Sequence, residues 1–195
     1  MDINLGKKDV VIYLAGKIES NGWRQSIVDI RNHFYDFNYP AASDLKSAFP
    51  INYRDNIFIS GPFFLSCDHS CYHGEESHGL GRGKMTCAGK RGFTEAEVID
   101  ICKAQIEKSD IVLAYIDDDT CYGSLYELGL ASAMGKIVIT IFDTKAREQK
   151  MWFVAKNSDY SLILGDQKMR KSQLNPEIIK LAIEISNRIK ARIKP

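Results

Sequence analysis

Short apolar runs alternate with amphipathic segments along most of this chain. Apolar runs of strand length lie at 10–15, 57–59, 111–116, 137–142 and 160–164. Apolar positions at helical spacing predict helices over 23–33, 94–109, 123–134, 146–156 and about 176–193. Continuous apolar strands that alternate with helices are typical of a parallel sheet covered on both faces. The pattern therefore predicts an α/β fold, doubly wound around a parallel five-stranded sheet.

Two segments interrupt the alternation. Residues 35–55 contain two prolines and are expected to form an irregular connection. Residues 66–92 are rich in glycine, cysteine and histidine and predict a long loop insertion, which in a compact domain is usually functional or disordered. The total length of 195 residues fits a single domain over 1–195.

The segment 110–136 joins the clearest predicted strand to a helix, and Glu127 is its leading candidate for chemistry. We expect Glu127 in the first turn of that helix, at the carboxyl edge of the sheet, where ligands bind in open α/β folds. A carboxylate there can act as a nucleophile or as a base. The spacing from Ser124 to Glu127 also fits a capping box, in which Glu127 would only bind a backbone N–H.

The ends of the other predicted strands supply further candidates. Tyr13 is expected either to hydrogen-bond a ligand or to pack in the core, and Gly16 permits close approach of a ligand to the backbone. Arg24 suits a phosphate or a carboxylate. The acidic run 117–119 is either a solvated loop or, because it follows a strand's carboxyl end, a segment of which one member contacts a sugar hydroxyl or a metal. The residues expected to bind substrate are Gly16, Trp23, Arg24, Gly61, Pro62, Phe63, Asp68, His69, Gly123 and Ser124.

The loop 66–92 gathers most of the histidines and cysteines of the chain. Thiolate and imidazole are the usual ligands of zinc, and glycine lets a loop wrap around an ion. The candidate ligands of a structural zinc are Cys67, Cys71, His73 and His78, with a spacing that is not that of a standard zinc finger. The alternative is a glycine-rich lid whose histidine and aspartate side chains contact substrate.

The composition is typical of a globular protein and argues against a nucleic-acid-binding or membrane-spanning protein. Hydrophobic residues make up 45% and charged residues 26%, the balance of a globular protein, and the formal net charge is +1. That charge provides no basic field for a nucleic acid polymer, and no apolar run reaches the roughly 18 residues of a membrane span. Five cysteines without a spaced framework predict a reducing, cytoplasmic compartment. The candidate chemistry requires no cofactor.

Three motifs together resemble the nucleoside 2-deoxyribosyltransferase family. They are Tyr-Leu-Ala-Gly at 13–16, Asp-Ile-Val-Leu-Ala at 110–114 and Gly-Ser-Leu-Tyr-Glu-Leu-Gly at 123–129. The resemblance covers residues 10–16 and about 94–142. It implies a flavodoxin/Rossmann-like fold, a homo-oligomer and cleavage of the N-glycosidic bond of a nucleoside or nucleotide. Glu127 matches the family's glutamate that attacks the anomeric carbon, and Tyr13 matches the tyrosine that helps orient it.

Two positions depart from the family's pattern. Cys102 stands where the family commonly has an aspartate that helps to protonate the leaving base, and Cys121 stands where another aspartate binds sugar hydroxyls. Asp119 is expected to substitute for the second aspartate by a shift of the loop. A histidine or the aspartate of the loop 66–92 is expected to supply the proton to the leaving base.

The leading hypothesis is an enzyme that hydrolyses or transfers the glycosyl group of a nucleoside or nucleotide through Glu127. The alternatives are a nucleotide-binding sensor without turnover, which the two cysteines favour, and an effector that cleaves a dinucleotide such as NAD. The apolar cluster 151–153, Met-Trp-Phe, is expected to be an interface, a base-stacking wall or part of the buried core.

Overall fold

The computed structural model describes residues 9–17, 23–27, 49–62, 95–164 and 177–193. The strands of these residues are β1 (Val10–Gly16), β2 (Ile51–Arg54), β3 (Ile57–Ser60), β4 (Ile111–Ile116), β5 (Ile137–Phe142) and β6 (Tyr160–Ile163). The helices are α1 (Trp23–Ile27), α5 (Glu95–Lys108), α6 (Tyr122–Ala133), α7 (Lys145–Lys150), α8 (Trp152–Asn157) and α9 (Glu177–Ile193).

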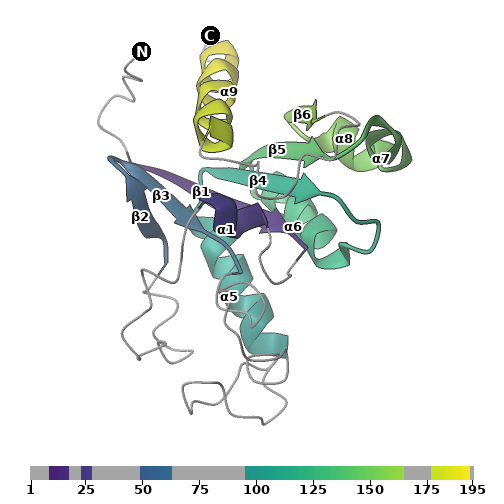
Figure 1. Cartoon of the computed structure of the whole chain (residues 1–195). Helices are drawn as coiled ribbons and strands as arrows, with labels where there is room; N and C mark the ends of the chain where they lie inside the picture. Colours follow the sequence, from purple (N-terminus) through teal and green to yellow (C-terminus); the bar gives the residue numbers. More distant parts are fainter. Residues whose placement is uncertain (1–8, 18–22, 28–48, 63–94, 165–176, 194–195) are drawn as a thin grey trace.

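The strands form one mostly parallel sheet in the order β2-β3-β1-β4-β5-β6 (Figure 1). Every neighbouring pair from β3 to β6 is parallel, and only β2 runs antiparallel to β3. The prediction of an α/β fold is confirmed. The sheet has one strand more than expected, because residues 51–54 fold back on β3 through the turn at Asp55 and Asn56. The sequence pattern does not predict this edge strand, because Asn52 and Arg54 are polar and interrupt any apolar run.

Side chains of alternate residues in the central strands pack into two hydrophobic clusters, one on each face of the sheet. Ile12 and Leu14 belong to the cluster that α1 and α9 cover. Tyr13 and Ala15 belong to the cluster that includes buried residues of α6 and α8. Figure 1 shows α9 on one side of the sheet and α5 and α6 on the other. This two-sided burial explains why β1 and β4 read as continuous apolar runs.

The segment expected to be one helix over 146–156 is two short helices, α7 and α8, which meet at Met151. The side chains of Trp152 and Phe153 are 63% and 65% exposed, and their rings meet edge to face at 5.8 Å. The core interpretation of the cluster 151–153 is therefore wrong for these two rings, while Met151 packs partly against the core.

Helix α1 is described only over Trp23–Ile27, and the loop 66–92 lies outside the described residues. Among the helices that the structure describes, none combines the length and apolar character needed to cross a bilayer.

Candidate functional site

The centre of the sheet places the carboxyl ends of β1 and β4 side by side. From β1 the chain proceeds to β3 on one side, and it then returns through α5 to β4 on the other side of β1. In open α/β sheets, ligands bind in the crevice outside the strand ends where the connections diverge in this way. Helix α6 follows β4 directly, so its N-terminal turns lie at the same edge (Figure 1).

Tyr13 of β1 and Glu127 of α6 meet beside this position. The phenol O–H of Tyr13 donates a hydrogen bond of 2.5 Å to Oε1 of Glu127. Tyr13 is fully buried, whereas Glu127 is partly exposed. A rigid strand thus holds one oxygen of a carboxylate that solvent can reach, and this is the pair that the sequence motifs single out.

Helix α6 begins at Tyr122, with Cys121 as the N-cap residue and no side-chain capping hydrogen bond. Ser124 therefore lies inside the helix and is buried, so the capping-box interpretation of Ser124 and Glu127 is wrong. The expectation of Glu127 in the first turn is also wrong, because it is the sixth residue of α6 and lies in the second turn. The carboxylate therefore bonds across to β1 instead of to its own helix start.

The environment of Tyr13 keeps its phenol protonated. Burial raises the pKa of Tyr13 well above its usual 10.0, and the negative charge of Glu127 and the neighbouring Cys102 raise it further. Because burial and a nearby negative charge both disfavour the phenolate, Tyr13 remains a hydrogen-bond donor to Glu127 at physiological pH.

Cys102 of α5 completes a cluster with these two residues. Its thiol lies close enough to Tyr13 and Glu127 to influence, and be influenced by, both groups electrostatically. Burial raises the pKa of Cys102 to about 12, and the charge of Glu127 contributes in the same direction. The position at which the nucleoside 2-deoxyribosyltransferases commonly carry an aspartate therefore lies beside Tyr13 and Glu127 in this chain, but it holds a neutral thiol that is a very weak acid.

The expected phosphate ligand Arg24 is fully buried, and two of its N–H groups donate to the carbonyl oxygens of Gly16 at 3.1 Å and Lys17 at 2.9 Å. Its neighbour Trp23 is also buried, with its ring tilted against that of Tyr115. A Cβ on Gly16 would lie 2.5 Å from Nε1 of Trp23. These contacts fix the backbone at the end of β1.

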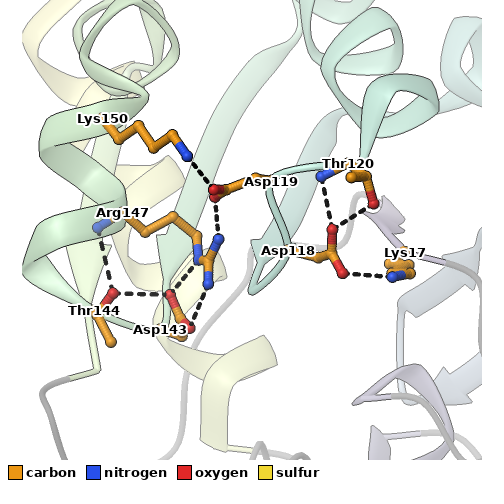
Figure 2. A network of polar contacts seen from close by, with 8 residues as sticks. All are labelled: Lys17, Asp118, Asp119, Thr120, Asp143, Thr144, Arg147 and Lys150. Atoms are coloured by element: carbon orange, nitrogen blue, oxygen red, sulfur yellow. Dashed lines mark hydrogen bonds and ion pairs between the residues drawn. The ribbon is translucent and has the colours of Figure 1, made fainter.

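Two aspartates of the acidic run after β4 contact different parts of the structure, as Figure 2 shows. Asp118 forms an ion pair with Lys17, which follows β1, with 2.5 Å between Nζ and Oδ2. Asp118 also accepts hydrogen bonds from the backbone N–H and the hydroxyl of Thr120. Asp119 instead pairs with Arg147 and Lys150 of α7. The sequence expectation favoured Asp119 for the ligand, whereas Asp118 is the member that bonds to β1.

These contacts keep both carboxylates ionised. Hydrogen bonds from Lys17 and then from Thr120 lower the pKa of Asp118 far below its usual value. A hydrogen bond from Lys150 lowers the pKa of Asp119. Arg147 also pairs with Asp143 at the end of β5, at 2.7 Å, so the network ties two loops of the carboxyl edge together (Figure 2).

The remaining expected residues fall into two groups. Gly61 and Pro62 are buried directly after β3, and Gly123 is exposed in the first turn of α6 with no atom near its missing Cβ. The expected residues that lie outside the described part of the chain are Phe63, Cys67, Asp68, His69, Cys71, His73 and His78. Within the described residues, no three metal-binding side chains gather into a cluster.

Two further polar residues lie at this site without a signal in the sequence. The Gly61 N–H donates to Oε1 of Gln105 at 2.8 Å, which ties α5 to the end of β3. Ser60 precedes Gly61 and is the register partner of Tyr13 in the adjacent strand. Ser60 and Gln105 lie near Tyr13 because segments far apart in the sequence pair with each other. Local sequence patterns do not predict such pairing.

No protein-family model matches this chain, and a search of the curated proteins gives no match either. The geometry of the site is therefore what bears on function.

Proposed function

We propose that this chain is an N-glycosidase or deoxyribosyltransferase-like enzyme that cleaves or transfers the glycosyl group of a nucleoside or nucleotide. The observation that carries the proposal is the 2.5 Å hydrogen bond from the buried Tyr13 hydroxyl to the partly exposed Glu127 carboxylate. A carboxylate that a rigid strand orients at the carboxyl edge of a parallel sheet is suited to attack a bound sugar.

The proposed fold assignment supports this function. The parallel strands follow the spatial order β3-β1-β4-β5-β6, which corresponds to the flavodoxin-like order 2-1-3-4-5 once the antiparallel edge strand β2 is set aside. We therefore assign a doubly wound, flavodoxin/Rossmann-like fold. That fold and the motif that contains Glu127 agree with the resemblance to nucleoside 2-deoxyribosyltransferases.

The proposed reaction proceeds in two steps. A carboxylate oxygen of Glu127 forms a bond to the anomeric carbon as the C–N bond breaks, and the electron pair of that bond leaves with the base. Water or a second base then attacks the anomeric carbon and frees the carboxylate. With water, the products are the sugar and the protonated base. Tyr13 orients the carboxylate in both steps.

Asp118 and Lys17 are proposed to contact the sugar. The pair joins the end of β1 to the loop after β4, beside the point where the strand connections diverge. An ionised carboxylate can accept hydrogen bonds from sugar hydroxyls. We assign this role to Asp118 because the carboxylate of Asp119 is engaged by two cations of α7.

A nucleotide-binding sensor is the second candidate, and Cys102 is the observation that favours it. An enzyme of this type needs a group that protonates or stabilises the leaving base. The Cys102 thiol, with a pKa of about 12, is poorly suited to donate a proton near neutral pH. A protein with these features would bind a nucleotide and leave its glycosidic bond intact.

The experiment that separates these functions is a survey of base release. The full chain is incubated with nucleosides, nucleoside monophosphates and NAD, and free base is measured by chromatography. We expect at least one substrate to release base, and we expect Glu127→Gln to abolish that release. Glu107→Gln is the matched control, because Glu107 is exposed near the end of α5. Binding without release supports the sensor, and release from NAD alone supports the NAD-cleaving effector.

We also propose a homo-oligomer, because exposed aromatic side chains accumulate on α6 and α8. Tyr122 and Tyr126 lie one turn apart on α6, and Trp152 and Phe153 lie on α8. Large exposed apolar groups of this kind are typical of interaction surfaces. A structural zinc on the candidate ligands of the loop 66–92 remains a separate proposal, which elemental analysis of the purified protein tests directly.

A further inference from the structure

Two buried polar side chains near Tyr13 and Glu127 each have one polar atom without a hydrogen-bond partner among the described residues. Ser60 and Gln105 are 1% and 4% exposed. Within the part of the chain that the structure describes, Oγ of Ser60 and Nε2 of Gln105 have no hydrogen-bond partner. Most buried polar atoms in proteins are satisfied, because an unpaired one costs free energy. Unpaired buried polar atoms of this kind are candidates for contact with a ligand.

The amide of Gln105 has a defined orientation. Its Oε1 accepts the hydrogen bond of 2.8 Å from the Gly61 N–H. Because a backbone N–H can only donate, the oxygen must face Gly61, and Nε2 keeps both of its N–H donors. The Ser60 hydroxyl, which precedes Gly61, can both donate and accept. Together the two side chains offer donors and an acceptor next to each other.

Both side chains lie on the face of the sheet that carries Tyr13. Ser60 is the register partner of Tyr13 in parallel strands, so the two side chains point to the same face. Gln105 follows Cys102 by three residues on α5, which places both on one side of the helix. Since Ser60 is paired in register with Tyr13, and Tyr13 donates to Glu127, Ser60 and Gln105 lie near the proposed nucleophile.

We propose that Ser60 and Gln105 form the subsite for the base, and that they select a base with a carbonyl group next to a ring N–H. Nε2 of Gln105 donates to the carbonyl oxygen, and Oγ of Ser60 accepts from the N–H. This lactam edge is present in 6-oxopurines and in uracil-type pyrimidines. The corresponding edge of adenine has the opposite donor and acceptor order. The inference rests on the proposed function and specifies its substrate class.

The same contacts explain how the base can leave. As the C–N bond breaks, the electron pair passes into the base and increases the negative charge on its carbonyl oxygen. A preformed N–H donor from Gln105 stabilises that charge without transferring a proton. The base departs as a hydrogen-bonded anion and takes its proton from water. A neutral Cys102 next to the site is compatible with this step, because no side-chain acid is required.

The test measures binding separately from turnover. Inosine and adenosine are titrated by calorimetry into full-length Glu127→Gln, with and without a second substitution. We expect inosine to bind more tightly than adenosine, and we expect Ser60→Ala to weaken inosine binding about tenfold, the value of a hydrogen bond lost from a site. Gln105→Glu keeps the acceptor for Gly61 and removes the donors, so it is expected to abolish the preference for inosine.

Ser109→Ala is the matched control, because Ser109 is also buried but its hydroxyl donates to the Ile106 carbonyl at 2.8 Å. Ser60→Ala should weaken binding and leave the melting temperature unchanged or higher, since its hydroxyl has no partner to lose among the described residues. Ser109→Ala should lower the melting temperature and leave binding unchanged. The proposal is overturned if inosine does not bind, or if Ser60→Ala binds it as tightly as the parent. Selective binding of inosine by Glu127→Gln, together with no base release by the wild type from any substrate, would overturn the enzyme function but not the subsite.

Discussion

Tyr13 and Glu127 are separated by 114 positions in the sequence, yet the hydroxyl of the first donates a 2.5 Å hydrogen bond to a carboxylate oxygen of the second. The contact joins β1 to the second turn of α6. Its donor is fully buried and its acceptor is partly exposed. The hydrogen bond therefore links the rigid centre of the sheet to a group that a ligand can reach.

Removal of the Tyr13 hydroxyl should reduce turnover while the fold is kept. A hydrogen bond to a charged group contributes about 1.5–3 kcal/mol, so Tyr13→Phe is expected to lower the rate of base release about 10- to 100-fold. The rate and the melting temperature are measured together. Tyr160→Phe is the control, because Tyr160 is exposed on the edge strand β6. Equal rates for Tyr13→Phe and the wild type would show that the hydrogen bond does not orient the carboxylate.

The two neighbouring aspartates should respond differently to the same change. Asp118→Asn is expected to raise KM about tenfold, since it removes a charged acceptor in the loop after β4, where Asp118 pairs with Lys17. Asp119→Asn is expected to change KM less than about twofold and to have little effect on stability, because exposed ion pairs contribute little. Steady-state kinetics of both variants decide this. The reverse pattern would assign the sugar contact to Asp119.

The Cys102 thiol predicts a pH dependence of stability. Its pKa rises from 9.0 to about 12 on folding, so the folded protein holds this proton more tightly than the unfolded chain. The associated stability is complete below pH 9 and declines as the pH rises towards 12, by up to about 1.4 kcal/mol per pH unit. Urea unfolding at about pH 8 and about pH 10.5 should therefore show a larger loss for the wild type than for Cys102→Ala. Equal losses would contradict the buried neutral thiol.

Two glycines should give opposite results when each is replaced by alanine. The Cβ of Gly16→Ala would lie 2.5 Å from Nε1 of buried Trp23, and such overpacking costs about 1–3 kcal/mol. Gly129 lies within α6 with open space around its missing Cβ, so Gly129→Ala should add about 0.5–1 kcal/mol through helix propensity. Thermal unfolding of both variants measures the difference. An unchanged melting temperature for Gly16→Ala would show that the backbone at the end of β1 or the Trp23 ring can shift to accommodate the added methyl group.

The pattern of the sequence predicts those features that depend on local chemistry. Apolar runs locate β1, β4 and β5, because buried parallel strands are apolar on both faces. The motif around Glu127 identifies the candidate for chemistry. The predicted start of its helix is too late, because Ser124 is chemically a better N-cap residue than Cys121. The start of α6 at Tyr122 follows from the turn after β4, which no local preference reveals.

Features that depend on distant contacts are not predictable in this way. Asp118 and Asp119 are equivalent in the sequence, and only the positions of Lys17 and of α7 distinguish them. Ser60 and Gln105 are ordinary polar residues until β3 pairs with β1 and α5 packs beside them. The burial of Arg24 likewise requires the end of β1 as its partner.

The measurement that tests the central claim most directly is the mapping of a covalent glycosyl adduct. The full chain is reacted with a substrate that releases base, or with its 2-fluoro sugar analogue to slow the second step, and is then quenched and digested for mass spectrometry. The account predicts an added sugar mass on the peptide that contains Glu127, and no adduct in Glu127→Gln. Base release without such an adduct, or an adduct on another residue, would contradict it.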